Sequence, residues 1–458
     1  MSYIIIAVLF CIASGYLFKK ASGTISLYSP NMMSVIFYLY FVLNNVVGAV
    51  IIVNGVDNHY AIAKLSSDVY RQYGFWAIMY TIVGFPIGQL LVNLICHKKN
   101  MRKIYYQYVK APLQDEDQRI SNFIQLKILF LCIISFLAVI YTMISIGGSP
   151  LSMFFSGSDA LDMAFARAEA KGNFGGNEYV KNTFGLFLTP FLSYVVYGYW
   201  VLYRKRFYKI LYRIMFFLSV LILTYDLEKA PILLYFLGFL FFKIYNNYKL
   251  SSKTLLYIAV IVLFLIIVMY KIVMDYETDA LFLYNSGFIG RLTLSSNAGL
   301  FLTFDIFPAH HSFLGFSSFS NILSSLFDIP YSERSARYVM EYVNPSGIQS
   351  GLAGVYNSLF TSEAWANWGI AGVILSPIYV GMVIQSLYIM ILSSRKTPFF
   401  LALFVFYTIR SSINGGINDY IYNVSTFFMI FIYYFVYYFG KGLIKYEKNN
   451  STLPVQNR

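Results

Sequence analysis

Four cations in this sequence stand where a phosphate group could be bound. Arg291 follows Gly290 at the start of an apolar segment, and Arg410 lies near the end of another, with Asp419 as a candidate partner. Lys229 lies between two apolar segments, and Arg167 lies in the charged stretch 159–171 of a predicted outer loop. A charge beside or inside a long apolar segment is costly and usually faces a ligand, a cavity or a partner. Since a guanidinium bonds two oxygens at once, we predict that these cations bind a phosphate or pyrophosphate.

A second group of residues could transfer protons. Glu363 stands at the beginning of a long apolar segment, where a carboxylate could accept a proton or bind sugar hydroxyls. His310 and His311 follow Asp305 and Pro308 on a short polar turn. Histidine titrates near neutral pH and therefore suits general acid or base catalysis. The sequence does not decide between Glu363 and the histidine pair as the base.

Each of these residues also has an ordinary structural explanation. Arg167 could belong to a solvated helix with charge pairs four residues apart. Lys229 could be neutralised by the acidic residues just before it, and Arg291 could extend toward the membrane surface. Glu363 could stabilise the first turn of its helix. The two histidines could belong to an ordinary polar loop.

Composition decides the class of protein in which these residues work. Of 458 residues, 58% are hydrophobic and only 12% are charged, with a mean hydropathy of +0.61. A soluble domain carries about 25% charged residues, and disordered or collagenous chains lack so many large apolar residues. The three cysteines all fall in apolar segments, which predicts neither a disulfide nor a metal site. We therefore predict an all-α polytopic integral membrane protein.

The apolar segments predict eleven transmembrane helices within a single domain of residues 1–458. Most of them can cross about 30 Å of hydrocarbon at about 1.5 Å per residue. The predicted spans are 3–18, 31–54, 73–96, 122–146, 181–202, 207–225, 229–247, 254–274, 366–393, 397–414 and 421–440.

Lysine and arginine divide unequally between alternate loops. Most of the 34 lie in the loops after the first, third, fifth, seventh and ninth spans and in the C-terminal tail. By the positive-inside rule these segments are cytoplasmic, so the N-terminus is predicted outside and the C-terminus inside. This topology explains the net charge of +13 without a nucleic-acid partner.

Two predicted outer loops, 147–180 and 275–365, are much longer than the others. The second contains apolar stretches at 292–307 and 313–327 that are too short to span a bilayer. Such stretches fit interfacial or re-entrant helices at the outer membrane surface. The sequence has no internal repeat of the kind that many transporters contain.

The sequence resembles the oligosaccharide repeat-unit polymerases, the Wzy-type O-antigen polymerases of the bacterial inner membrane. In architecture the resemblance covers the whole chain. In sequence it rests on Phe288–Phe316, Glu363–Gly372, Glu228–Pro231 and Arg410. Some members of that family carry an arginine, ten intervening residues and then a glycine in both large loops. Here that spacing leads from Arg167 to Glu178 and from Arg337 to Ile348, so the strict motif is absent.

The resemblance implies an inverting glycosyltransferase that needs neither a metal nor a cofactor. Donor and acceptor would both be oligosaccharides on undecaprenyl pyrophosphate, and a chain-length regulator protein would be a further partner. The four cations would hold the leaving pyrophosphate, and Glu363, His310 or His311 would take the proton of the acceptor hydroxyl. Glycan contacts are expected from Asp305, Trp365 and Arg337.

Two rival functions are compatible with the same residues. An O-antigen ligase-type enzyme would transfer the glycan to lipid A core from the same donor. A flippase or other transporter of lipid-linked oligosaccharides is the second rival, although short loops and repeat-like halves would be expected there. If the chain is a polymerase of this kind, we expect a protein of the inner membrane with a periplasmic N-terminus and a cytoplasmic C-terminus.

Overall fold

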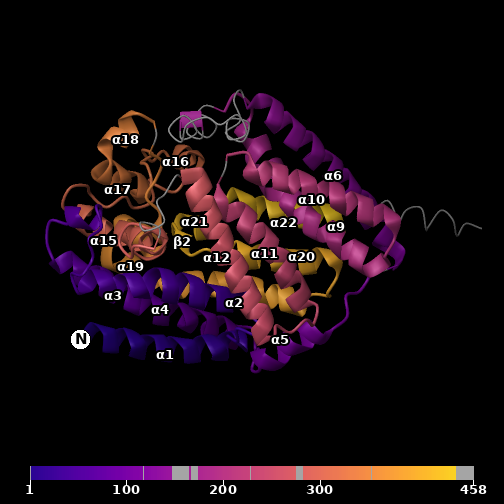
Figure 1. Ribbon diagram of the computed structural model, residues 1–458, viewed down its shortest axis with the longest axis horizontal. Coiled ribbons are helices and arrows are strands. Elements are labelled where there is room, and N and C mark those ends of the chain that lie inside the picture. The colour runs from indigo at the N-terminus through magenta and orange to yellow at the C-terminus, as the bar shows by residue number, and fades with distance from the viewer. Residues whose placement is uncertain are drawn as a thin grey trace, which may run out of the picture.

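Apolar helices form most of this computed structural model, which describes residues 2–116, 118–146, 165–166, 174–226, 228–274, 282–351 and 353–439 (Figure 1). Within these ranges, eight helical segments are long and apolar enough to cross a membrane. They are α1 (Ser2–Ser22); α2 (Met32–Val35), η1 (Ile36–Val46) and α3 (Val47–Val53) together; α4 (Val69–Ile95); α6 (Gln118–Ser145); η3 (Val180–Leu188) with α9 (Thr189–Tyr203); α10 (Arg206–Thr224); α19 (Thr361–Ser393); and α21 (Asn418–Ile421) with α22 (Val424–Tyr437).

The other three predicted spans correspond to shorter apolar helices in the described residues. These are Ala230–Tyr245 within α11 (Lys229–Tyr245), Ser252–Phe264 within α12 (Ser252–Met274), and α20 (Pro398–Ile409). The fold is thus an all-α membrane-type bundle, and the prediction of eleven spans is supported for eight of them.

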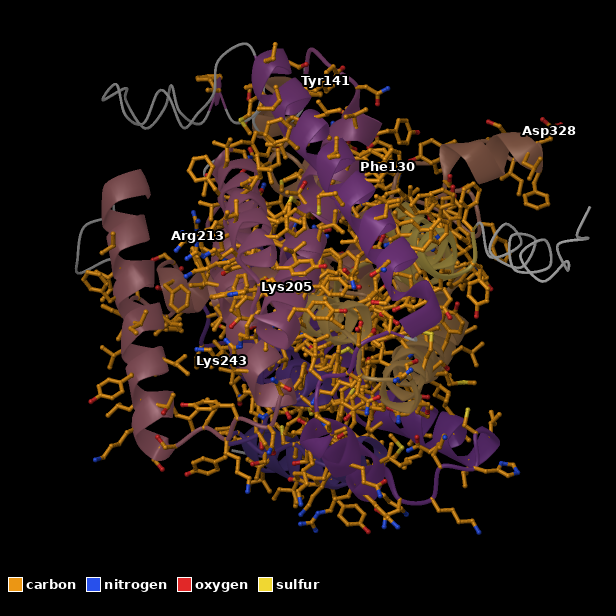
Figure 2. All side chains as sticks on the ribbon, turned by 90° about the vertical axis from the view of Figure 1, so that its right-hand side faces the viewer. Phe130, Tyr141, Lys205, Arg213, Lys243 and Asp328 are labelled. Atoms are coloured by element: carbon orange, nitrogen blue, oxygen red, sulfur yellow. The ribbon has the colours of Figure 1, made fainter. Side chains whose placement is uncertain are left out.

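Tyr141 of α6 and Asp328 of the second long loop lie high in Figure 2, and Lys243, near the end of α11, lies lower in the same view.

Helices α4 and α19 pack closely against each other in the core. A Cβ atom on Gly88 of α4 would lie 2.0 Å from the carbonyl oxygen of Ile378, and one on Gly381 of α19 would lie 2.1 Å from that of Phe85. Small residues let two membrane helices approach until their backbones touch. The α4–α19 contact therefore depends on glycine on both sides.

The second long loop contains a buried helix rather than only interfacial ones. α14 (Phe288–Gly290), η4 (Arg291–Ser295) and α15 (Ser296–Ile306) run on from one another, and every residue from Asn297 to Ile306 is buried. The stretch predicted at 292–307 is therefore core, because α4, α19 and β1 cover it. Three short helices gather at one edge of the molecule in Figure 1: α16 (Asn321–Leu326), α17 (Ser335–Val343) and α18 (Pro345–Gln349).

Helix α20 ends earlier than predicted. It has 12 residues, or about 18 Å at 1.5 Å per residue, which is less than the hydrocarbon thickness. Beyond Ile409 the chain becomes extended and forms β2 (Asn414–Gly415), which pairs antiparallel with β1 (Ser358–Leu359). Irregular backbone at membrane depth is tolerated where protein buries it or where it lines a cavity. The predicted span 397–414 is thus part helix and part loop.

Helix α19 is interrupted near its start. Gly369 has φ +59° and ψ −139°, a conformation that glycine adopts without strain. The carbonyls of Ala366 and Asn367 instead accept the backbone N–H groups of Leu314 (2.9 Å) and Gly315 (2.9 Å). Residues 361–368 therefore form a separate first segment that is tied to the second long loop.

Two shorter elements complete the described fold. η2 (Ile62–Lys64) lies in the loop between α3 and α4, and α5 (Met101–Lys110) lies between α4 and α6. Most of the first long loop, predicted at 147–180, lies outside the described residues.

Candidate functional site

An ion pair between a half-exposed arginine and a buried glutamate stands at the junction of the second long loop with α19. Arg334 precedes α17, and Glu363 lies in the first turn of α19. The Nε atom of Arg334 donates to Glu363 Oε1 at 2.6 Å, and its Nη2 donates to Oε2 at 3.0 Å. Its Nη1 donates to Oδ1 of Asp419 at 2.9 Å. One guanidinium thus binds two carboxylates, one of them in the two-pronged geometry that makes such pairs strong.

The backbone around the pair is shaped to hold it. The pairing of β1 with β2 brings residues 358–363 beside residues 413–419, and the N–H of Asn418 donates to Glu363 Oε2 at 3.0 Å. A Cβ atom on Gly416 would lie 1.9 Å from Arg334 Nη2 and 2.0 Å from Glu363 Oε2. Only glycine leaves room for the pair at that position.

The pair fixes the charge of Arg334. Burial by itself lowers the pKa of this guanidinium, but the hydrogen bonds and negative charges of Glu363 and Asp419 outweigh it, so the net pKa is raised. Arg334 therefore remains a cation whenever the two carboxylates are ionised.

A polar cavity of about 370 Å³ opens beside this ion pair. Its wall includes Arg334, Glu363 and Asp419, together with the side chains of Asn357 and Ser358. Amides, hydroxyls, a cation and carboxylates offer both donors and acceptors. Such a lining suits a ligand rich in hydroxyl groups.

A second cavity, of about 430 Å³, adjoins the first. Asn414, Gly415 and Asp419 line both cavities, so the segment around β2 forms their common wall. Arg410 lines the second cavity, where much of the remaining wall is apolar, including Leu387 and Phe427. This cavity therefore combines the cation of Arg410 and the carboxylate of Asp419 with several apolar wall residues.

Packing positions the guanidinium of Arg410. It lies over the rings of Phe406 (4.6 Å to the centroid) and Phe187 (5.1 Å). Its Nη2 donates to the carbonyl oxygen of Leu186 at 2.9 Å, and the residue remains exposed. Stacking on two rings orients a guanidinium and leaves its other N–H groups available for an anion.

Among the predicted site residues whose side chains the structure describes, only Glu363 and Arg410 line these cavities. Trp365 is two residues beyond Glu363 but donates its Nε1–H to the carbonyl oxygen of Phe307 (3.0 Å) and packs on Phe304 and Phe313. It lines neither cavity.

The predicted residues of the second long loop lie elsewhere. Asp305 is buried and accepts from the N–H (2.7 Å) and hydroxyl (2.6 Å) of Ser66. His310 and His311 are exposed, and their rings lie against Tyr342 (6.0 Å) and Tyr338 (4.7 Å) of α17. None of these residues lines the two cavities.

The remaining cations of the prediction are separate from the ion pair. Arg337 pairs with Glu333 (3.2 Å) and Glu341 (3.4 Å) on the surface of α17, an arrangement typical of a solvated helix. Arg291 is exposed at the start of η4 and lines neither cavity. Arg167 and the side chain of Lys229 lie outside the described part of the structure.

Two residues of the site were not predicted as functional. Arg334 stands 29 positions before Glu363 and has no local pattern that marks it. Asp419 was predicted only as a partner of Arg410, whereas its carboxylate bonds to Arg334. The nearest sequence signal is the Gly415–Gly416 pair just before Asp419, which indicates a close backbone approach.

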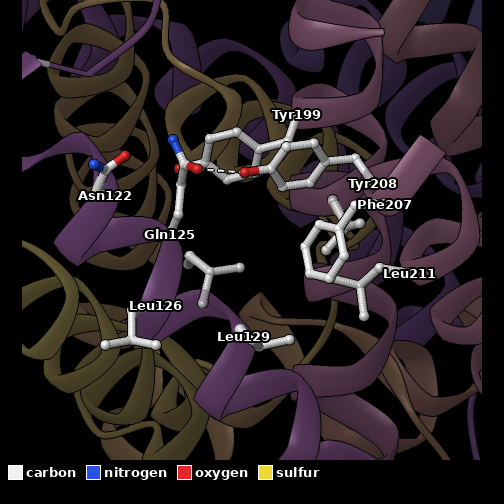
Figure 3. A pocket seen from close by; sticks show the side chains of 10 residues that line it. Asn122, Gln125, Leu126, Leu129, Tyr199, Phe207, Tyr208 and Leu211 are labelled. Atoms are coloured by element: carbon white, nitrogen blue, oxygen red, sulfur yellow. Dashed lines mark hydrogen bonds between the residues drawn. The ribbon is translucent and has the colours of Figure 1, made fainter. Parts of the chain in front are cut away.

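A third cavity lies away from this site, among α6, α9 and α10 (Figure 3). It holds about 200 Å³, and Tyr208 donates across its rim to Gln125. Its wall has no charged side chain and none of the predicted site residues. Among the described residues there is also no group of three or more histidine, cysteine or carboxylate side chains that could hold a metal ion.

No protein-family model, no curated protein and no solved structure matches this chain.

Proposed function

We propose that this chain is a bacterial inner-membrane glycosyltransferase that joins lipid-linked oligosaccharide repeat units into O-antigen polysaccharide at the periplasmic face. The observation that carries the proposal is the pair of adjoining cavities, one polar and one largely apolar with an arginine, that share the wall Asn414–Gly415–Asp419. A donor made of a glycan, a pyrophosphate and a polyprenyl chain has a polar part, an anionic part and an apolar part in the same order.

The Arg410 cavity suits the lipid end of the donor. Its apolar wall, with Leu387 and Phe427, would face the first isoprene units, and the stacked guanidinium would bind the pyrophosphate. As the glycosidic bond breaks, negative charge accumulates on that pyrophosphate. A fixed cation beside it stabilises the transition state more than the ground state.

The polar cavity suits the sugars. In the proposed step, a hydroxyl oxygen of the acceptor glycan attacks the anomeric carbon of the donor sugar. The bond from that carbon to the pyrophosphate oxygen breaks, undecaprenyl pyrophosphate leaves with the bonding electrons, and the hydroxyl proton passes to a carboxylate. Inversion at the anomeric carbon follows from attack opposite the leaving group.

Asp419 is the carboxylate best placed to take that proton. It lines both cavities and is 43% exposed. Glu363 is 4% exposed, and three hydrogen bonds from Arg334 and Asn418 occupy its oxygens. In this arrangement Glu363 positions Arg334, and Arg334 in turn orients Asp419.

A reconstituted reaction tests the proposal. Purified protein in nanodiscs receives undecaprenyl-pyrophosphate-linked repeat units, and the products are separated on a gel. We expect a ladder spaced by one repeat unit. Transfer to added lipid A core without a ladder would favour the ligase. Movement of substrate across a liposome bilayer without any product would favour a transporter.

Matched variants test the roles of the residues in the same assay. Arg410→Ala should reduce the turnover number at least a hundredfold, whereas Arg395→Ala, an arginine of a basic loop, should change it less than twofold. Asp419→Asn should remove turnover but leave donor binding within about twofold. If Glu363→Gln removes turnover while Asp419→Asn does not, the assignment of the base is wrong.

A further inference from the structure

The segment around α5 carries a cluster of cations that have no role in the proposed glycosyl transfer. Five cations, Lys98, Lys99, Arg102, Lys103 and Lys110, lie within thirteen residues, and no aspartate or glutamate occurs between residues 97 and 114. All but Lys98 are exposed. Within the described residues, none of the five forms a salt bridge with a carboxylate. The charge of this segment is therefore directed outward.

The structure holds this helix firmly against the bundle. The buried side chains of Met101, Tyr105 and Val109 face α1, α11 and α19. At its C-terminal end the ammonium of Lys396 donates to the carbonyl oxygens of residues 108 (3.3 Å), 109 (3.0 Å) and 111 (2.7 Å). At its N-terminal end the Asn100 side chain accepts from the N–H of Lys103 at 3.0 Å. A surface helix fixed at both ends presents its polar face with little loss of freedom on binding.

A shallow, open cavity of about 360 Å³ lies on the polar face of α5. Arg102, Lys103 and Lys110 line it, together with the phenol of Tyr106 and the amides of Asn100 and Gln107. The lining contains three cations and three neutral polar groups but no carboxylate. Converging donors of this kind match a phosphate diester, whose oxygens carry the complementary charge.

The neighbouring end of α4 indicates that the cavity borders lipid. Leu94 and Ile95, directly before the basic segment, are 72% and 67% exposed. Apolar side chains so exposed at the end of a membrane helix fit the acyl region of a bilayer, and the cations just beyond them fit the level of the headgroups. Figure 1 shows α5 beside the ends of α1 and α11, at the edge of the bundle.

We propose that α5 binds the headgroup phosphate of an anionic phospholipid in the leaflet on the basic side of the membrane. Arg102, Lys103 and Lys110 bind the phosphate, and Tyr106 and Gln107 bond to the headgroup. The occupant is a bilayer lipid rather than a soluble phosphate, because the basic segment directly follows Leu94 and Ile95, two exposed apolar side chains at the end of a membrane helix.

The test measures lipid retention by native mass spectrometry. Protein purified in detergent is incubated with equal amounts of phosphatidylglycerol and phosphatidylcholine. The wild-type protein should retain phosphatidylglycerol preferentially, and the R102Q/K103Q/K110Q variant should lose about a hundredfold in apparent affinity, because each of the three cations contributes about fivefold. The matched control K205Q/R206Q/R213Q removes three cations from the beginning of α10 and the residue before it, and should keep the preference.

Four outcomes would overturn the proposal. The triple variant could keep the preference, or both triple variants could lose it equally, which would indicate a general charge effect. Inorganic phosphate could compete with phosphatidylglycerol at equal concentration, which would indicate a soluble anion. Finally, if the triple variant does not fold, the single variants R102Q and K103Q are measured instead, and unchanged retention in both would refute the proposal.

Discussion

The Arg334–Glu363 pair predicts an asymmetric loss of stability. Removing Arg334 leaves the Glu363 carboxylate, which is only 4% exposed, without its cation. Removing Glu363 leaves Arg334, which is 36% exposed and still bound to Asp419 at 2.9 Å. A buried carboxylate without its partner costs more than a half-exposed cation that keeps a second partner. Arg334→Ala should therefore destabilise the protein more than Glu363→Ala.

The magnitude follows from the bonds that each variant loses. Arg334→Ala removes two charge-assisted hydrogen bonds, at 2.6 and 3.0 Å, from a carboxylate that keeps only the N–H of Asn418. Breaking a fully buried pair costs about 3–5 kcal/mol. Because water reaches Arg334, we expect about 2–3 kcal/mol, against about 1 kcal/mol for Glu363→Ala.

The assay is a double-mutant cycle of equilibrium unfolding in mixed detergent micelles, followed by tryptophan fluorescence. The double variant should be no less stable than Arg334→Ala alone, which gives a coupling energy of at least about 1 kcal/mol. Arg337→Ala serves as the control, because the partners of Arg337 are 57% and 46% exposed, and should cost about 0.5 kcal/mol or less. Additive losses, or a larger loss for Glu363→Ala, would refute the reasoning.

Three further predictions concern the same structure. Gly416→Ala should lower the free energy of unfolding as much as Arg334→Ala does, because its Cβ would lie 1.9 Å from the Arg334 guanidinium. The Cβ of Gly415→Ala would meet no atom nearer than 3.2 Å, so that variant should be nearly neutral in the same unfolding assay. Burial lowers the pKa of His59 more than the charge of Asp57 raises it, so the melting temperature should fall as the pH drops from about 6.5 through the lower folded pKa, and His59→Gln should flatten this dependence; an unchanged pH profile would contradict it. Lys396→Met leaves carbonyls at the end of α5 without their donor and should make the α4–α6 loop more sensitive to limited proteolysis; equal cleavage rates would contradict this role.

Much of the candidate site could not be read from residue type. An arginine or a carboxylate looks the same in the sequence whether it faces a cavity or solvent. Glu363 and Arg410 were predicted as site residues, and both line cavities. A charged side chain at the end of an apolar membrane helix is costly to expose to lipid and therefore usually faces a cavity or a partner. Asp305 looked equally suitable but binds Ser66 inside the fold.

The sequence by itself determined the class of protein and the positions of most of its apolar helices. These properties depend on runs of apolar residues, which are local. Only the tertiary structure decided that Arg334 meets Glu363 and Asp419, the latter 85 positions away. The β1–β2 pairing and the early end of α20 bring those segments together, and such long-range contacts follow from packing of the whole chain, which no local pattern encodes.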